Sequence, residues 1–179
     1  VSRLNLMAMD TDDLAPLLRE DLIRLCIAAF QKDDFANLFV YFPTGRRHFL
    51  AYLSERLIGH AVVTTRRIQP EGARVLRTAY VDAVAIAPDV QRHGYGTQLM
   101  TYLGREIMDY ELGCLATRSP SFYHRMGWEV WRGAQAGRDE TGVFPTPDQS
   151  GTMILRLAAT PSFDLEGLLT IDKQDGRVW

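Results

Sequence analysis

The sequence predicts a mixed α/β (α+β) domain, and three observations support this fold class. Apolar residues recur every three or four positions in an N-terminal segment and again after residue 97, as expected for amphipathic helices. Two runs between these segments are rich in Val, Ile, Thr and aromatic residues, which is the composition of strands. Helical and extended segments also alternate along the chain, as in layered α/β proteins. With 179 residues, we expect one domain over residues 1–179.

The N-terminal part is expected to be helical. Leucine and alanine recur with helical spacing from Leu14 to Ala29, so a helix should run to about Phe30. It should start near Thr11-Asp12-Asp13, whose carboxylates suit the positive end of the helix dipole. A second short helix is expected over residues 33–40.

The following residues have the pattern of an antiparallel meander. Residues 47–53 and 57–68 flank the turn Ser54-Glu55-Arg56 and predict a hairpin, and residues 75–87 predict a further strand. Downstream, the pattern predicts helices over 97–110 and 120–126 and short strands over 112–117, 128–131 and 152–157. Residues 133–151 lack periodicity and are expected to form a long loop, and residues 163–179 an irregular tail.

Composition and charge exclude several classes of protein. The chain is 46% apolar and 23% charged with a net charge of −2, which disfavours a protein that coats nucleic acid. It has no signal-peptide pattern and no long apolar run, so a cytoplasmic protein without a membrane partner is the default expectation. The two cysteines, Cys26 and Cys114, lie among apolar residues without metal-ligand spacing, so we expect buried thiols and no metal. The net charge is −3 over residues 1–44, +3 over 45–120 and −2 over 121–179.

Residues 84–97 form the most informative segment, because a predicted strand leads there through a glycine-bearing turn into a helix. The N-terminus of a helix presents unpaired N–H groups and a positive dipole end, so it binds phosphate groups. Gly94 and Gly96 would let the backbone approach an anion, and Arg92 and His93 would add positive charge. A Walker A loop is excluded because there is no Gly-Lys-Ser/Thr ending. A Rossmann loop is excluded because Leu99 stands where the third glycine belongs.

The remaining pattern, Gln/Arg-x-x-Gly-x-Gly between a strand and a helix, resembles the pyrophosphate loop of the GNAT superfamily of N-acetyltransferases. Ser121 to Trp128 resembles a downstream Tyr-x-x-x-Gly-aromatic segment of that family. The resemblance implies a GNAT fold with a central, mostly antiparallel twisted sheet flanked by helices, and acetyl-CoA as co-substrate.

A second resemblance, to aminoglycoside 2′-N-acetyltransferases, covers nearly the whole chain. It rests on residues 80–86, 110–115 and 123–128, and on the C-terminal segments 146–152 and 176–179. It implies transfer of an acetyl group from acetyl-CoA to a primary amine, most simply the 2′-amine of an aminoglycoside, by direct attack on the thioester.

These resemblances imply roles for particular residues. The cofactor would be held by the strand edge and by the loop, at Val84, Ala85, Ile86, Gln91, Arg92, His93, Gly94, Tyr95, Gly96 and Thr97. The N–H of Val84 would stabilise charge on the thioester oxygen. Asp82 would take a proton from the attacking amine through water, or only bind its ammonium form, and both roles stay open. Tyr123 would protonate the leaving thiolate, unless it is only a packing aromatic.

A polycationic substrate calls for carboxylates and an aromatic wall. The candidates by resemblance are Asp33, Asp34, Asp82, Ala83, Ala116, Thr117, Asp148, Gln149 and Trp179, the last with its terminal carboxylate. The chain departs from the family at Gln149 and Arg177, where acids are common. A GNAT enzyme for another small amine or a peptide, and a non-catalytic acyl-CoA or drug-binding module, therefore remain alternatives. A homodimer is also open, because an exposed strand edge could pair two protomers.

Overall fold

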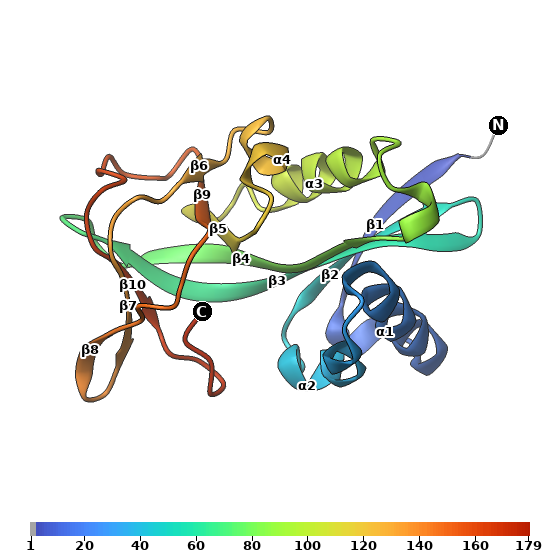
Figure 1. The fold of residues 1–179 in the computed structure, drawn as a ribbon, viewed down its shortest axis with the longest axis horizontal. Helices are drawn as coiled ribbons and strands as arrows, with labels where there is room; N and C mark the ends of the chain where they lie inside the picture. The colour runs from blue at the N-terminus through green and yellow to red at the C-terminus, as the bar shows by residue number, and fades with distance from the viewer. Residues whose placement is uncertain (1–2) are drawn as a thin grey trace. The chain divides into compact units, whose positions relative to one another are not determined.

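The computed structural model describes residues 3–179 (Figure 1). In chain order, its strands and α-helices are β1 (Leu4–Asp10), α1 (Pro16–Phe30), α2 (Leu38–Tyr41), β2 (Arg47–Leu53), β3 (Arg56–Pro70), β4 (Leu76–Ile86), α3 (Tyr95–Glu106), β5 (Leu112–Ala116), α4 (Pro120–His124), β6 (Glu129–Val130), β7 (Gln135–Asp139), β8 (Gly142–Pro145), β9 (Thr152–Arg156) and β10 (Leu169–Asp172). Short 3-10 helices occupy Thr11–Asp13, Asp33–Asn37 and Pro88–Val90. The predicted mixed sheet with flanking helices is confirmed.

The chain divides into two compact units. Unit 1 comprises the residues up to Thr64 together with Val81–Glu106, and unit 2 comprises Thr65–Tyr80 and Ile107–Trp179. Both β3 and β4 begin in one unit and end in the other. The expectation of one domain over residues 1–179 stays a prediction, and each unit is described by itself.

Unit 1 is a sheet covered on both faces. Its strands follow the order β1, β2, β3 and the second half of β4, with antiparallel pairing of β2 to both β1 and β3. Helix α3 lies on one face and α1 on the other (Figure 1). Neighbouring residues of β3 point to opposite faces of the sheet, since side chains alternate along a strand. A Cβ on Gly59 would lie 3.4 Å from Leu99 of α3, whereas the His60 ring lies 3.6 Å from the Cys26 sulfur of α1.

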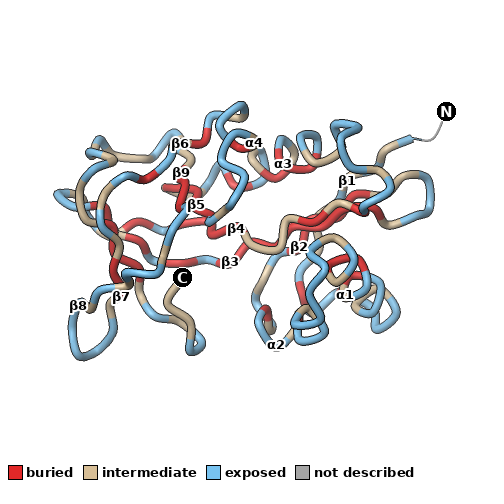
Figure 2. The backbone as a smooth tube through the Cα atoms, viewed as in Figure 1, coloured by how far each residue is buried: buried red, intermediate tan, exposed pale blue. Residues whose placement is uncertain are grey.

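Unit 2 is a second, longer run of strands. Its order is β6, β9, β5, the first half of β4, the end of β3, β10, β7 and β8. β10 is antiparallel to β3 and parallel to β7. The buried core of this unit includes Tyr80, Trp131 and Ile154, and the side chains of Val178 and Trp179 pack against it. Figure 2 shows that the buried residues follow the strands in both units.

Four strands differ from the sequence prediction. β1 precedes the expected helix start, β7 and β8 form a hairpin within the expected loop 133–151, and β10 lies within the expected irregular tail. β1 and β8 lie at edges of the sheet, whereas β7 and β10 are short and pair with each other across a long stretch of chain. Helix α3 also begins at Tyr95, two residues earlier than expected, and it ends at Glu106 rather than residue 110.

Within residues 3–179, no helix is long and apolar enough to span a membrane. The same part of the chain contains no group of three or more His, Cys, Asp and Glu side chains arranged to hold a metal ion. Cys26 and Cys114 are buried, as expected, and burial raises the pKa of the Cys26 thiol to about 12.

Candidate active site

The loop between β4 and α3 in unit 1 has the backbone geometry of an anion site. The chain takes left-handed conformations at Arg92 (φ 64°) and Gly94 (φ 84°). The first hydrogen bond of the helical turn runs from the Gln98 N–H to the Gly94 carbonyl, over 3.1 Å. The N–H groups of the preceding helical residues, Tyr95 to Thr97, therefore have no carbonyl partner within the helix. They form the positive end of α3, as the sequence motif predicts.

The side chains of this loop leave the space above it open. A Cβ built on Gly94 meets no atom within 4 Å. The Gln91 amide donates to the Ile86 carbonyl at 3.0 Å, which ties the loop to the end of β4. The Nδ1 of His93 lies 2.8 Å from the Gln91 carbonyl oxygen and must carry a proton to bond it. Arg92 and His93 are exposed, so their charged and polar groups can reach an anion beside the helix terminus.

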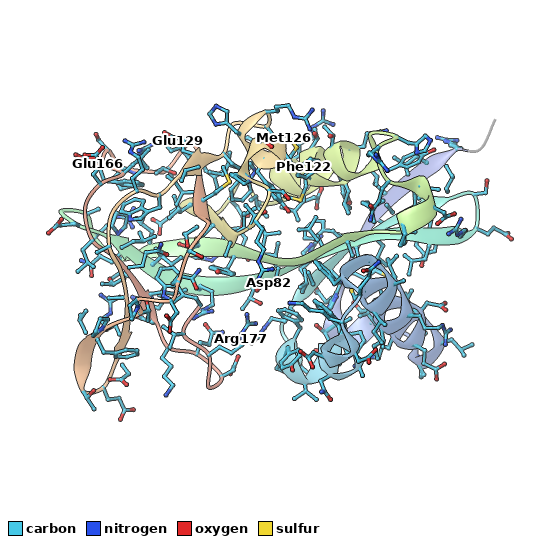
Figure 3. The ribbon with its side chains drawn as sticks, in the orientation of Figure 1. Asp82, Phe122, Met126, Glu129, Glu166 and Arg177 are labelled. Carbon is cyan, nitrogen blue, oxygen red and sulfur yellow. The ribbon has the colours of Figure 1, made fainter. Side chains whose placement is uncertain are left out.

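The strand β4 contains an interruption next to the predicted catalytic residues. Ala83 has φ 49°, a left-handed conformation that costs a non-glycine residue about 1–3 kcal/mol and that can mark a functional site when it lies inside a strand. Asp82, Ala83 and Val84 are all half-buried, so the in-and-out alternation of a regular strand is lost over these residues. Figure 3 shows Asp82 on this part of β4. The structure thus places Asp82 and Val84 on either side of a distorted residue.

Two histidines that sequence analysis assigns no catalytic role support this distortion. The Nδ1 of His60 lies 3.1 Å from the Ala83 carbonyl oxygen, and the Nε2 of His60 lies 2.9 Å from the Nδ1 of His48. The Nε2 of His48 lies 3.1 Å from the Thr11 hydroxyl. Burial lowers the pKa of His48 to about 4 and that of His60 to about 3, so both rings are neutral at pH 7. The predicted hairpin of β2 and β3 brings these two rings to the same face of the sheet. The hairpin pattern is therefore the feature of the sequence from which their proximity could have been predicted.

The predicted acid, Tyr123, lies in α4 of unit 2. Its ring is buried, with edge contacts to Phe122 at 4.8 Å and to Trp128 at 6.2 Å between ring centroids. Burial raises the pKa of its hydroxyl to about 12, so it stays protonated at physiological pH. Within residues 3–179, no side-chain or backbone group hydrogen-bonds this hydroxyl.

Four of the predicted substrate residues meet at the start of β9. The N–H of Thr117 donates to the Gly151 carbonyl at 2.9 Å, and Ala116 pairs with Thr152 across β5 and β9. A Cβ on Gly151 would lie 2.1 Å from the Thr117 carbonyl oxygen, so only glycine allows this approach. The Gln149 amide donates to the Thr152 hydroxyl at 3.1 Å. Asp148 is the exposed neighbour of Gln149.

Trp179, the fifth substrate candidate of unit 2, joins this group. Its indole N–H donates to the Thr146 hydroxyl at 2.9 Å, at the start of the turn that carries Asp148. The segment before it is anchored by Arg66, which is buried and donates to the Val178 and Asp172 carbonyls. This role of Arg66 could not be predicted from the sequence, because an arginine in a strand gives no sign of acceptors that lie more than 100 residues away.

Asp33 and Asp34 lie elsewhere in unit 1, on the exposed 3-10 helix between α1 and α2. For the described residues 3–179, no hydrogen bond or ion pair of either carboxylate is found. The structure therefore leaves both carboxylates to solvent or to a cationic ligand, and it places them on a different element from Asp82.

Comparison with known proteins assigns the class. Residues 18–131 match the family model described as an acetyltransferase (GNAT) domain. The chain is also 32% identical, over 94% of its length and 89% of the relative's, to an aminoglycoside 2′-N-acetyltransferase of Mycolicibacterium fortuitum. The chain belongs to the GNAT acetyltransferase family. Within that family, its similarity to the Mycolicibacterium enzyme covers more of the chain than the matched domain does.

Solved structures show the same fold. The GNAT family N-acetyltransferase YhbS of Escherichia coli, solved in complex with CoA, aligns over 95% of this chain and 90% of its own, with a TM-score of 0.69 and 17% identity. An acyl-CoA N-acyltransferase of Pseudomonas aeruginosa aligns over 87% of this chain and 100% of its own, with a TM-score of 0.59 and 16% identity. Some other matches are longer proteins: this chain spans 34% of a GCN5-related N-acetyltransferase of Kribbella flavida, with a TM-score of 0.56 and 19% identity.

Proposed function

We propose that this acetyltransferase transfers the acetyl group of acetyl-CoA to the 2′-amine of an aminoglycoside. The observation that carries the substrate assignment is the 32% identity to the Mycolicibacterium aminoglycoside 2′-N-acetyltransferase over nearly the full length of both chains. The grouping of Thr117, Gln149 and Trp179 in unit 2 supports it, because these candidates come from three separate segments. An indole face beside hydroxyl and amide groups suits a hydroxylated sugar.

The residues of unit 1 fit the pyrophosphate of CoA. The open space over Gly94, the free N–H groups at the start of α3 and the exposed Arg92 together satisfy a bound anion. Acetyl-CoA supplies the activated thioester that the amine attacks. The contribution of the loop is to hold the phosphates in place so that the acetyl end is presented to β4 in one position.

Asp82 and Val84 are proposed to serve the reacting groups. A primary amine is mostly protonated at neutral pH and must lose a proton before it can attack. The Asp82 carboxylate would attract the ammonium group and take that proton through a water molecule. The N–H of Val84 would donate to the thioester oxygen, where negative charge develops during the attack. Tyr123 would donate a hydrogen bond to the departing thiolate, whose reference pKa is about 8.5, and pass on to it the proton that the amine releases, so that the phenol itself stays protonated.

A second candidate function, acetylation of another small amine, is favoured by two residues of the tail. Gln149 uses its amide N–H₂ on Thr152, and it carries no negative charge. Arg177 adds a positive charge next to Val178. Both changes reduce the attraction for a polycation, and a substrate with fewer amines would tolerate them better.

A thiol-release assay separates these functions. The purified protein and acetyl-CoA would be given aminoglycosides with a 2′-amine, polyamines, simple amino sugars and peptides, and NMR would locate the acetyl group on each product. Turnover of the aminoglycosides at the 2′-nitrogen supports the proposal. Turnover of the other amines alone selects the second candidate, and turnover of none would indicate a non-catalytic binding module.

The role of Asp82 is resolved by the variant Asp82→Asn. If the carboxylate is the base, kcat falls on the order of a hundredfold or more, and the loss depends on pH. If it only binds the ammonium group, KM for the amine rises and kcat is largely kept. Asp21→Asn, at an exposed carboxylate of α1, is the matched control and should leave both constants unchanged.

A further inference from the structure

We propose that His60 is a positioning residue for acetyl transfer, because it holds Ala83 in its left-handed conformation. The inference rests on the function proposed above, in which the flanking residues Asp82 and Val84 act on the amine and on the thioester oxygen. A change at Ala83 would turn the peptide groups on both sides of it. The direction of the Asp82 side chain and of the Val84 N–H therefore depends on what holds Ala83.

The positions of the protons follow from the contacts. The Ala83 carbonyl can only accept, so the bond at 3.1 Å requires a proton on the Nδ1 of His60. A neutral His60 then has a lone pair on Nε2, which accepts from the Nδ1–H of His48 at 2.9 Å. The Nε2 of His48, which is then unprotonated, lies 3.1 Å from the Thr11 hydroxyl, and that hydroxyl also lies 3.1 Å from the Arg46 carbonyl oxygen and 3.2 Å from that of Pro43. The Ala83 carbonyl therefore selects the arrangement in which both rings carry their proton on Nδ1.

The environment of His60 makes this support rigid. His60 and His48 are fully buried, and their ring centroids are 5.2 Å apart. The polar contacts of the His60 ring are the Ala83 carbonyl, the His48 ring and the Cys26 sulfur, which lies 3.6 Å from Nδ1. A positive φ is sterically unfavourable for alanine. If the backbone at Ala83 relaxed to a negative φ, its buried carbonyl would lose the hydrogen bond from His60. The hydrogen bond therefore stabilises the strained conformation.

Two variants of His60 separate positioning from packing. In His60→Asn the amide nitrogen comes close to the place of Nδ1 and can still donate to Ala83, whereas in His60→Gln the longer side chain carries its amide toward the place of Nε2. We expect His60→Gln to lower kcat on the order of tenfold or more, with a smaller change in KM for acetyl-CoA. His60→Asn should recover most of the kcat. An equal loss in both variants would overturn the inference.

A double-mutant cycle with Ala83→Gly provides a readout that a packing role would not change. Glycine adopts a positive φ without a steric penalty, so it needs less support from the imidazole. The loss of kcat caused by His60→Gln should therefore be several-fold smaller in the Ala83→Gly background than in the natural one. Independent effects, with the same fold-loss in both backgrounds, would contradict the positioning role.

The tautomers are measured without any amine substrate, which keeps this inference distinct from the proposed function. Imidazole ¹⁵N NMR at pH 7 should show a proton on the Nδ1 of both His60 and His48, and no proton on the Nε2 of either ring. A proton on the Nε2 of His60 would overturn the inference even if aminoglycosides are acetylated. If no amine is acetylated, the proposed function fails, and the same cycle is then measured by melting temperature, where coupling of His60 to Ala83 is still expected.

Discussion

The indole Nε1–H of Trp179 donates a hydrogen bond to the Thr146 hydroxyl at 2.9 Å. This bond joins the C-terminal segment to a turn closed by the Gln149 N–H on the Thr146 carbonyl at 3.1 Å. Asp148 lies within that turn. Three residues with proposed roles in substrate binding are therefore linked, so the placement of the C-terminal segment bears on the substrate site proposed for unit 2.

The anchoring of this tail by Arg66 can be tested with a neighbouring arginine as control. Arg66→Gln removes donors from the Val178 and Asp172 carbonyls, so we expect the free energy of unfolding to fall by about 2 kcal/mol, measured with urea. Hydrogen exchange over residues 173–179 should also become faster. Arg67→Gln affects only an exposed ion pair and should cost less than about 1 kcal/mol. Equal losses in the two variants would contradict the anchor.

The phosphate loop can be tested with two glycines of matched geometry. Gly94 and Gly45 both have a positive φ (84° and 77°), and a Cβ on either meets nothing within 4 Å. Alanine at either position should destabilise unit 1 by about 1 kcal/mol through backbone strain alone. Gly94→Ala should in addition raise the Kd for CoA about tenfold, measured by calorimetry, because its methyl group occupies the space above the loop. CoA binding that weakens equally in Gly45→Ala would argue against this site.

Tyr123→Phe should lower kcat on the order of tenfold to a hundredfold and leave the Kd for CoA nearly unchanged, since only the proton donor is removed. Because burial raises the pKa of Tyr123 to about 12, ionisation of this residue should cause no loss of rate in the natural protein below about pH 11. Tyr41→Phe, on the exposed part of α2, is the control and should keep the natural kcat. An unchanged kcat in Tyr123→Phe would contradict the role of Tyr123 as proton donor and leave it a packing role only.

Stability should depend on pH through the two buried histidines. In the unfolded chain they take up protons below their usual pKa of 6.5, whereas the folded protein accepts them only near pH 4 for His48 and pH 3 for His60. The unfolded state therefore binds more protons between these values, and the free energy of unfolding decreases as the pH falls from 6.5 toward 4. The slope can reach about 1.4 kcal/mol per pH unit for each histidine.

Urea unfolding at about pH 7.5, 6 and 5 measures this slope, in a range above the titration of ordinary carboxylates. His60→Asn, which has no ionisable group at that position, should show a shallower dependence than the natural protein. A natural protein whose unfolding free energy is constant across this range would contradict the burial of neutral histidines.

The parts of the fold that depend on local pattern could be predicted from the sequence. β2, β3 and the turn at Ser54 follow from alternation and from adjacent pairing, and α1 follows from the spacing of its leucines. β7 and β10 could not be predicted in this way, because each is held by the other across an unrelated stretch of chain. Gly137 illustrates the difficulty: glycine suggests a turn, yet here a Cβ would lie 2.4 Å from the Phe144 ring.

The same distinction applies to the candidate site. The loop between β4 and α3 is a contiguous motif, so its glycine turn and the start of α3 could be predicted from residue types alone, and its role in binding phosphate stays a prediction. The left-handed conformation of Ala83 could not be predicted, since the segment Val81-Asp82-Ala83-Val84 has the composition of an ordinary strand. Its support by His60 depends on a pairing register and on burial, which only the folded chain defines.

The substrate assignment is tested most directly by one ratio of rate constants. Kanamycin B and kanamycin A differ only in carrying an amine or a hydroxyl group at C2′, so they isolate the proposed reacting atom. We predict thiol release from acetyl-CoA with kanamycin B at a kcat/KM at least a hundredfold above that with kanamycin A, since every other contact is shared. Equal rates with both compounds, or turnover of neither, would contradict transfer to the 2′-amine.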